Sequence, residues 1–191
     1  MIVLPSNNFR RRPATLMRYA GAVLALLASS AGIGHAQSAF DEDFDDDTKP
    51  WEEIAIQLPA PPVAANLLPF DVSGNATQTF AIDAKSLSLG SDGVIRYTLV
   101  ATSPAGARNV SYEGIRCASF EKKLYAFGHP DGSWSRSRND QWQRIVRNAA
   151  NRQHAVLFKD YFCDGLTVAG SAEQMLERIR RQRPLSDVPG Q

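Results

Sequence analysis

The chain has 191 residues, of which 43% are hydrophobic and 21% are charged, and its formal net charge at pH 7 is +1. This length and composition fit one globular domain that can bury a core. A charge so close to balance excludes a protein that bulk charge holds to nucleic acid or to anionic lipid.

Residues 1–36 have the three parts of a cleavable secretory signal peptide. Four arginines come first, an apolar run covers residues 20–31, and Gly-His-Ala at 34–36 forms a small-residue cleavage site. An apolar run of about a dozen residues is shorter than the roughly 20 that cross a bilayer as a helix, and no later run is long enough. We therefore expect a mature protein that starts near Gln37, lies outside the cytoplasm and has no membrane span. Met17 is an alternative start, because the single arginine after it would still give a compact signal.

An acidic segment follows the cleavage site, with six acids between Asp41 and Asp47. Cleavage leaves 17 basic and 20 acidic residues, a formal charge of −3, and the chain without the acidic run carries +3. Such a run repels itself and buries little surface, so we predict a disordered acidic tether over residues 37–48. A calcium loop is the alternative, because Asp41, Asp43, Asp45 and Asp47 alternate. The segment lacks the central glycine and the closing glutamate of an EF-hand loop.

The two cysteines of the chain, Cys117 and Cys163, both lie in the mature part. In an oxidising compartment an even pair predicts a disulfide. The bridge would close a loop of about 45 residues and stabilise the fold by roughly 3 to 4 kcal/mol. Two buried thiols are the alternative. No zinc spacing is present, and no metal or other cofactor is predicted.

Short strands are predicted in the first half of the mature chain, because apolar and β-branched residues alternate there between turn residues. They cover residues 54–58, 70–72, Thr79–Asp83, Val94–Thr102 and 108–117, and a further pair lies on either side of residues 129–132. Gly114 indicates a bulge in the strand over 108–117.

Helical spacing replaces this alternation after Asn139. A first helix is predicted from Trp142, Ile145, Val146 and Ala149, and a second helix covers residues 155–162. Residues 166–169 are predicted to add an edge strand. Ser171 and Gln174 then form a capping box for a last helix that ends near Arg183, before Pro184.

Strands first and helices later predict an α+β domain. We expect an antiparallel meander of about five to seven short strands, followed by C-terminal helices that pack on it. The domain is placed at residues 49–170, the last helix at 171–184 and a disordered tail at 185–191.

Several stretches of the chain carry a resemblance to a known family. They are Lys49-Pro-Trp-Glu-Glu, Asn66-Leu-Leu-Pro-Phe70, Arg96-Tyr-Thr-Leu-Val100, Asn109-Val-Ser-Tyr-Glu-Gly-Ile-Arg-Cys117, Asp131-Gly-Ser-Trp-Ser-Arg136, Asn151-Arg-Gln-His154 and Asp160-Tyr-Phe-Cys163. Together they resemble the cryptic neisserial protein family, called CNP-like, a group of small exported proteins of Gram-negative bacteria. The resemblance covers roughly residues 49–165, and its two cysteine-ending motifs are the most distinctive. It implies export to the periplasm, and it implies no mechanism because the family has no established function.

A hydrolase would need a serine on a strained turn or beside a histidine, and the sequence has no G-x-S-x-G elbow. His154 is the better histidine candidate, because it stands beside an apolar helix face and close in sequence to Asp160. A structural or merely exposed His154 is the alternative. His129 is interpreted as a surface histidine in a turn.

A cationic surface is the other candidate site. Arg136 and Arg138 alternate with Trp134, so on an extended strand all three would face one side. Arginine beside tryptophan can hold a carboxylate, a phosphate or a sugar ring. The alternative is a strand edge that charge protects from aggregation. Tyr112, Glu113 and Arg116 are interpreted either as part of a site or as cross-strand partners.

The leading hypothesis is a non-enzymatic periplasmic binding module, whose partner is an unknown envelope protein or a small anionic ligand. Its candidate binding residues are Tyr112, Arg116, Trp134, Arg136, Arg138 and His154. The rival hypothesis is a small periplasmic hydrolase that uses His154 and Asp160, and it requires these groups to meet the arginines in one concave pocket. A third hypothesis, an envelope assembly factor, predicts a large exposed apolar patch.

Overall fold

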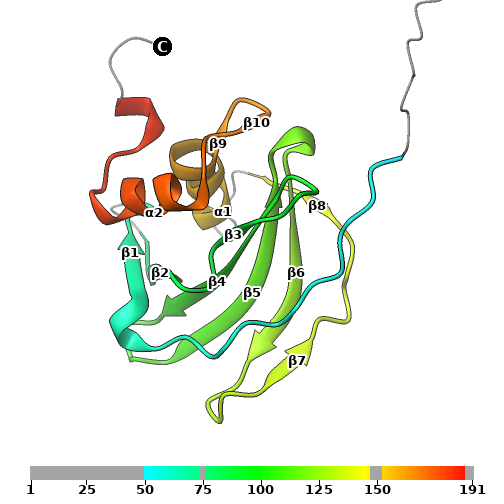
Figure 1. Cartoon of the computed structure of the whole chain (residues 1–191). Helices are drawn as coiled ribbons and strands as arrows, with labels where there is room; N and C mark the ends of the chain where they lie inside the picture. Colours follow the sequence, from blue (N-terminus) through cyan, green and yellow to red (C-terminus); the bar gives the residue numbers. More distant parts are fainter. Residues whose placement is uncertain (1–49, 74–75, 147–151, 188–191) are drawn as a thin grey trace, which may run out of the picture. The chain divides into compact units, whose positions relative to one another are not determined.

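An antiparallel sheet forms the centre of the fold (Figure 1). The computed structural model describes residues 50–73, 76–146 and 152–187. Within them the strands lie in the order β1-β2-β4-β5-β6-β7, while β3 pairs with β4 and β8 pairs with β6. Their bounds are β1 Leu67–Phe70, β2 Thr79–Asp83, β3 Ser88–Leu89, β4 Val94–Thr102, β5 Arg108–Arg116, β6 Glu121–Gly128, β7 Trp134–Arg136 and β8 Gln143–Arg144. The α+β class and the antiparallel meander are confirmed.

The central strands form where the sequence is richest in β-branched and aromatic residues. The predicted bounds of β2 and β4 are confirmed, and β5 ends one residue earlier than predicted. The bulge predicted at Gly114 is wrong, because the register shifts between Tyr112 and Glu113 and the extra residue is Tyr125 of β6. Gly114 instead lies under the Tyr125 ring, where an added Cβ would come within 2.5 Å of the hydroxyl oxygen.

Helices cover one face of the sheet. They are α1 (Arg152–Val156), the π-helical segment η4 (Leu157–Phe162) and α2 (Ala172–Arg180). Their apolar side chains join those of the sheet in one core, whose most buried members include Ile82, Ile95, Tyr97, Ile115, Leu157, Phe162, Met175 and Ile179. The predicted disulfide is confirmed, and it joins the residue after β5 to the residue after η4 with 5.7 Å between the two Cα atoms. It therefore ties the helical layer to the sheet.

The last helix begins as predicted. The hydroxyl of Ser171 accepts from the backbone N–H of Gln174, and the Gln174 side chain accepts from the backbone N–H of Ser171. The helix ends at Arg180 rather than near Arg183, and Gln182 then takes a left-handed conformation with φ 49°. Residues Leu185–Asp187, which were expected to be disordered, form a 3-10 turn that packs against η4.

An extended segment, residues 51–62, lies on the other face of the sheet; we call it the strap. Adjacent residues of a strand point to opposite faces, and Tyr97 enters the helix-side core while Arg96 bonds Glu53 of the strap. Ile56 and Leu58 pack against the aromatic side chains of β5 and β6. Figure 1 shows the strap in cyan, passing along the sheet.

The strand predicted at 54–58 is therefore wrong. The same alternation of apolar residues suits a chain that lies flat on a sheet, because every second side chain then faces the sheet. A segment in that position has no strand edge beside it to pair with, and the prolines at 59, 61 and 62 lack the N–H that a ladder needs.

Two further expectations are corrected. The helix predicted from Trp142 to Ala149 does not form in its described part, because Gln143 and Arg144 make β8 and the Ile145 N–H donates to the Phe120 carbonyl at 3.0 Å. Ala149 lies outside the described residues. The strand predicted at 166–169 becomes β10 (Thr167–Val168), which pairs with β9 (Cys163–Asp164) as a separate hairpin instead of an edge of the main sheet.

Short 3-10 turns complete the fold at Ala64–Asn66 (η1), Cys117–Ser119 (η2) and Leu185–Asp187 (η5). The segments predicted to be a signal peptide (1–36) and an acidic tether or calcium loop (37–48) lie outside the described residues. In the part of the chain that the structure describes, no helix has the length and apolar character needed to cross a membrane.

Candidate functional site

Two cavities of similar volume border the strap. The first, which we call the Trp134 pocket, has a volume of about 370 Å³ and is lined chiefly by Pro61, Pro62, Arg108, His129, Pro130 and Trp134. The second, the Glu53 cleft, has a volume of about 380 Å³ and is lined chiefly by Glu53, Lys123, Tyr125, Arg136, Ser137 and Asp140. Both combine side chains of the sheet with side chains of the strap, so the strap completes both cavities.

The walls of the Trp134 pocket are held rigidly. The indole N–H of Trp134 donates to the Pro59 carbonyl at 2.9 Å, which fixes the ring to the strap. Tyr112 packs edge-on to Trp134 with 6.2 Å between ring centroids. The turn between β6 and β7 is closed by a bond from the Gly132 N–H to the His129 carbonyl at 3.0 Å, and Gly132 has the positive φ of 85° that this turn needs.

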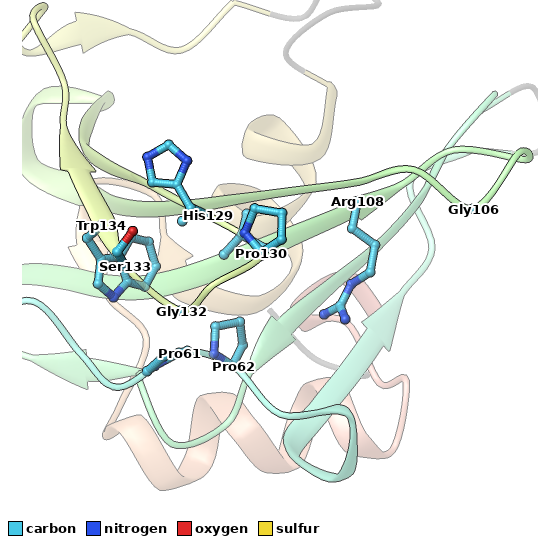
Figure 2. A pocket seen from close by; sticks show the side chains of 11 residues that line it. Pro61, Pro62, Gly106, Arg108, His129, Pro130, Gly132, Ser133 and Trp134 are labelled. Carbon is cyan, nitrogen blue, oxygen red and sulfur yellow. The ribbon is translucent and has the colours of Figure 1, made fainter.

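The charged group of this pocket is Arg108, at the start of β5. Its side chain extends past Pro130 toward Pro62, whereas the His129 imidazole turns away from the strap prolines (Figure 2). The His129 Nε2 lies 2.5 Å from the Ser135 hydroxyl oxygen. None of the lining residues is acidic, and Arg108 has no acidic partner among the described residues. The pocket therefore presents the Arg108 guanidinium beside the apolar rings of Trp134, Pro61 and Pro62.

Glu53 is the centre of a bonded cluster beside the second cavity. Its carboxylate accepts from the Tyr125 hydroxyl at 2.5 Å, from the Lys123 ammonium at 2.8 Å and from the Trp142 indole N–H at 3.2 Å. An Arg96 nitrogen lies 3.4 Å away. Burial raises the pKa of Glu53, but bonds from Lys123 and Tyr125 more than offset it, so the pKa lies below its ordinary value. The carboxylate is thus held ionised and saturated with donors.

Asp92 continues this cluster below the strap. It accepts from the Arg96 guanidinium at 2.6 and 3.1 Å and from the backbone N–H of Ile54 at 3.1 Å. Burial raises the pKa of Asp92, but the hydrogen bonds from Arg96 and from the backbone more than offset it. The pKa of Asp92 therefore lies below its ordinary value. Trp51 adds a bond from its indole N–H to the Asp92 carbonyl at 2.9 Å. These contacts anchor the start of the strap to the turn between β3 and β4.

His154 lies elsewhere, buried between α1 and the sheet with 4% of its surface exposed. Its Nε2 is 2.7 Å from the carboxylate of Glu113, which also accepts from the Ser111 hydroxyl at 2.6 Å and the Tyr97 hydroxyl at 3.2 Å. Burial raises the pKa of Glu113, but the charge and bond of His154 lower it to a net value below the ordinary one. The buried acid beside His154 is therefore Glu113, whereas the hydrolase hypothesis pairs His154 with Asp160.

The residues predicted to form one site are divided among several places. Tyr112 and Trp134 lie together beside the strap, and Arg116 stacks over the Trp51 ring at 3.7 Å from its centroid. Arg136 is exposed on the Glu53 cleft. β7 ends at Arg136, so Arg138 does not share its strand face; it is exposed and lines neither cavity. The His154 side chain is buried between its own helix, α1, and the sheet, so the structure does not bring it together with these arginines.

Sequence reasoning missed two residues that dominate the cavities, Arg108 and Glu53. Arg108 was one of many arginines, and nothing local marks it as facing a pocket. Glu53 ends the Lys-Pro-Trp-Glu-Glu stretch quoted for the family resemblance, so that motif was the available signal. Among the described residues, no group of three or more His, Cys, Asp or Glu side chains is placed to hold a metal ion.

Comparison with known proteins agrees with the motifs quoted above. No curated protein and no solved structure matches the chain. The model of the CNP1-like family matches residues 46–180, a stretch that contains the strap, the sheet, both cysteines and α2. The match extends past the 49–165 range of the sequence resemblance and covers most of the chain, so this protein belongs to the CNP1-like family.

Proposed function

We propose that this protein is a non-enzymatic binding module of the cell envelope, exported to the periplasm by a cleavable leader, and that it holds a small anionic ligand in the Trp134 pocket. The basic and apolar leader over residues 1–36 supports export. The buried Cys117–Cys163 disulfide supports it as well, because such bridges persist in oxidising compartments.

The observation that carries the ligand class is Arg108 in a pocket without acids. A guanidinium binds carboxylate and phosphate through parallel charge-assisted hydrogen bonds. The indole of Trp134 and the rings of Pro61 and Pro62 offer apolar surface for the body of such a ligand. The strap and the turn fix these walls in advance, which lowers the entropic cost of binding.

The hydrolase alternative gains no support from the placement of its residues. Its histidine is buried and bonded to Glu113, and its arginines lie on other parts of the surface. A proton carrier must come within hydrogen-bond reach of the substrate atom it serves. The His154 side chain would have to leave its buried place between α1 and the sheet to do so.

A matched ligand screen tests the proposal. The mature protein is titrated by calorimetry at low salt with benzoate and phenyl phosphate, and with benzamide as the neutral control. We expect the anions to bind and benzamide to bind at least about tenfold more weakly, since a charge-assisted hydrogen bond contributes about 1.5 to 3 kcal/mol.

Two exposed arginines give the variant and its control. R108Q should lose about tenfold or more in anion affinity, whereas R138Q should bind as the wild type does, because Arg138 lines neither cavity. Equal affinity of wild type and R108Q would reject the pocket. If the protein instead captures an envelope protein, and R108Q captures it equally well, the small-ligand proposal is rejected in favour of a protein partner.

Export has its own test. Amino-terminal sequencing of protein recovered from the periplasmic fraction should return Gln37 as the first residue. Recovery of the intact leader on protein from the cytoplasm would contradict the localisation.

A further inference from the structure

We propose that the Glu53 cleft is a second ligand site and that it takes a small zwitterion, such as a free α-amino acid. This site differs from the Trp134 pocket in its charge. It is lined by two acids and two bases, whereas the Trp134 pocket has no acid in its lining. The inference does not depend on the function proposed for the other pocket.

One acid and one base of the lining neutralise each other, because Lys123 pairs with Glu53 at 2.8 Å. Arg96 and Asp92 do not line the cleft, and they pair with each other at 2.6 Å. Glu53 also accepts from Tyr125 and Trp142, so its oxygens are already occupied by protein donors. This part of the lining offers a ligand a fixed surface rather than an unpaired charge.

The rim of the cleft carries the two charges that remain, Arg136 and Asp140. Both are exposed. Neither forms an ion pair with a described residue, and the Asp140 carboxylate accepts only from the neutral amide of its neighbour Gln141 at 2.8 Å. A cation and an anion therefore face the same cavity of about 380 Å³ without neutralising each other.

The loop between these charges is held by its own hydrogen bonds. The Ser137 N–H donates to the Tyr125 carbonyl at 2.8 Å, which ties the loop to β6. The Ser137 hydroxyl donates to the Asn139 carbonyl at 2.9 Å, and the Asn139 side chain accepts from the Gln141 N–H at 3.4 Å. These bonds hold the backbone from which Arg136 and Asp140 project, as a site for two opposite charges requires.

The chemistry of the ligand follows from this arrangement. Arg136 can hold a carboxylate through its guanidinium fork, and Asp140 can accept from an ammonium group. Ile54, Ala55 and Ile56 of the strap also line the cleft and offer contact to an aliphatic side chain. An amino acid with an apolar side chain presents all three groups. Because both rim charges are exposed, binding should be weak, in the millimolar range.

Leucine and its blocked forms provide a matched set of probes. The mature protein is titrated, by amide chemical shifts in NMR, with leucine, acetyl-leucine, leucine amide and acetyl-leucine amide. Leucine should shift the amides of residues 53–56 and 136–140. Removal of either charge from the ligand should weaken binding by about fivefold, the effect of one exposed ion pair.

Substitutions on the rim complete the test. R136Q and D140N should each weaken leucine binding about fivefold, and R138Q should not, because Arg138 is exposed in the same loop but does not line the cleft. All three positions are exposed, so unchanged urea midpoints will show that the fold is intact. Leucine binding that D140N leaves unaltered, or acetyl-leucine amide binding as well as leucine, would overturn the inference.

The proposals for the two cavities can be rejected independently. Acetyl-leucine is an anion with an apolar body, so it suits the Trp134 pocket. If it shifts amides around Trp134 in an R108Q-sensitive manner while leucine leaves residues 136–140 unmoved, the Glu53 cleft is not a ligand site and the proposed function stands.

Discussion

Replacement of Glu53 with glutamine should loosen the strap and lower the free energy of unfolding. The side chain is 17% exposed and accepts from Tyr125, Lys123 and Trp142, with Arg96 close by. Loss of one partner from a buried ion pair costs about 3 to 5 kcal/mol. The loss should be smaller here because Glu53 is partly exposed and because Arg96 keeps its bond to Asp92. We therefore expect E53Q to lower the free energy of unfolding by about 2 to 3 kcal/mol at pH 7.

Urea unfolding followed by tryptophan fluorescence measures this loss. Trp51 and Trp142 pack edge-on with 5.9 Å between ring centroids beside Glu53, so their emission reports on the strap. The control is E52Q, since Glu52 is an exposed residue of the same strap and its substitution should cost less than about 0.5 kcal/mol. Equal midpoints for E53Q and E52Q would refute the reasoning.

The same variant predicts a pH dependence. The folded-state pKa of Glu53 lies below the ordinary value of 4.5, so its contribution is complete above that value and is lost as pH falls through the folded pKa. The stability difference between wild type and E53Q should therefore narrow on acidification below pH 4.5. A difference that stays constant into strong acid would show that the charge of Glu53 is not the cause.

Three more variants probe the core. Replacement of both Cys117 and Cys163 by alanine should lower the free energy of unfolding by about 4 kcal/mol, because the bridge closes a loop with a sequence separation of 46. Urea unfolding against the oxidised wild type measures this loss. An unchanged free energy of unfolding would show that the bridge does not constrain the unfolded chain. E113A should lower the free energy of unfolding by about 3 kcal/mol or more, because it leaves His154 without its buried partner. A thermal unfolding midpoint within a degree of the wild-type value would contradict that bond. G114A should lower the free energy of unfolding by about 1 to 3 kcal/mol, because the added methyl group would displace the Tyr125 ring from the sheet. A G114A variant more stable than the wild type would contradict the close contact between Gly114 and Tyr125.

Local pattern was sufficient for the elements that depend on neighbours in sequence. The β-branched run over Val94–Thr102 forms β4 with the predicted bounds. The capping box at Ser171 starts α2, and the pair of cysteines forms the bridge. In each case the signal and the structure involve the same short stretch or the same two residues.

The helix predicted from Trp142 and the composition of the candidate site were wrong because both depend on contacts between residues distant in sequence. Trp142 and Ile145 have helical spacing, but the Trp142 indole bonds Glu53, 89 positions away, and Ile145 bonds Phe120, so the segment is extended. Tertiary contacts of this kind override weak local preference. The candidate site was hidden for the same reason, because Arg108 meets Pro61 and Trp134 only when the strap lies on the sheet.

The central claim is that the Trp134 pocket binds a small anion through Arg108, and a chemical-shift map with benzoate tests it most directly. The account predicts saturable shifts confined to the amides of residues 106–110 and 128–134, and their loss in R108Q. Shifts that persist in R108Q, or that benzamide reproduces at equal concentration, would contradict it.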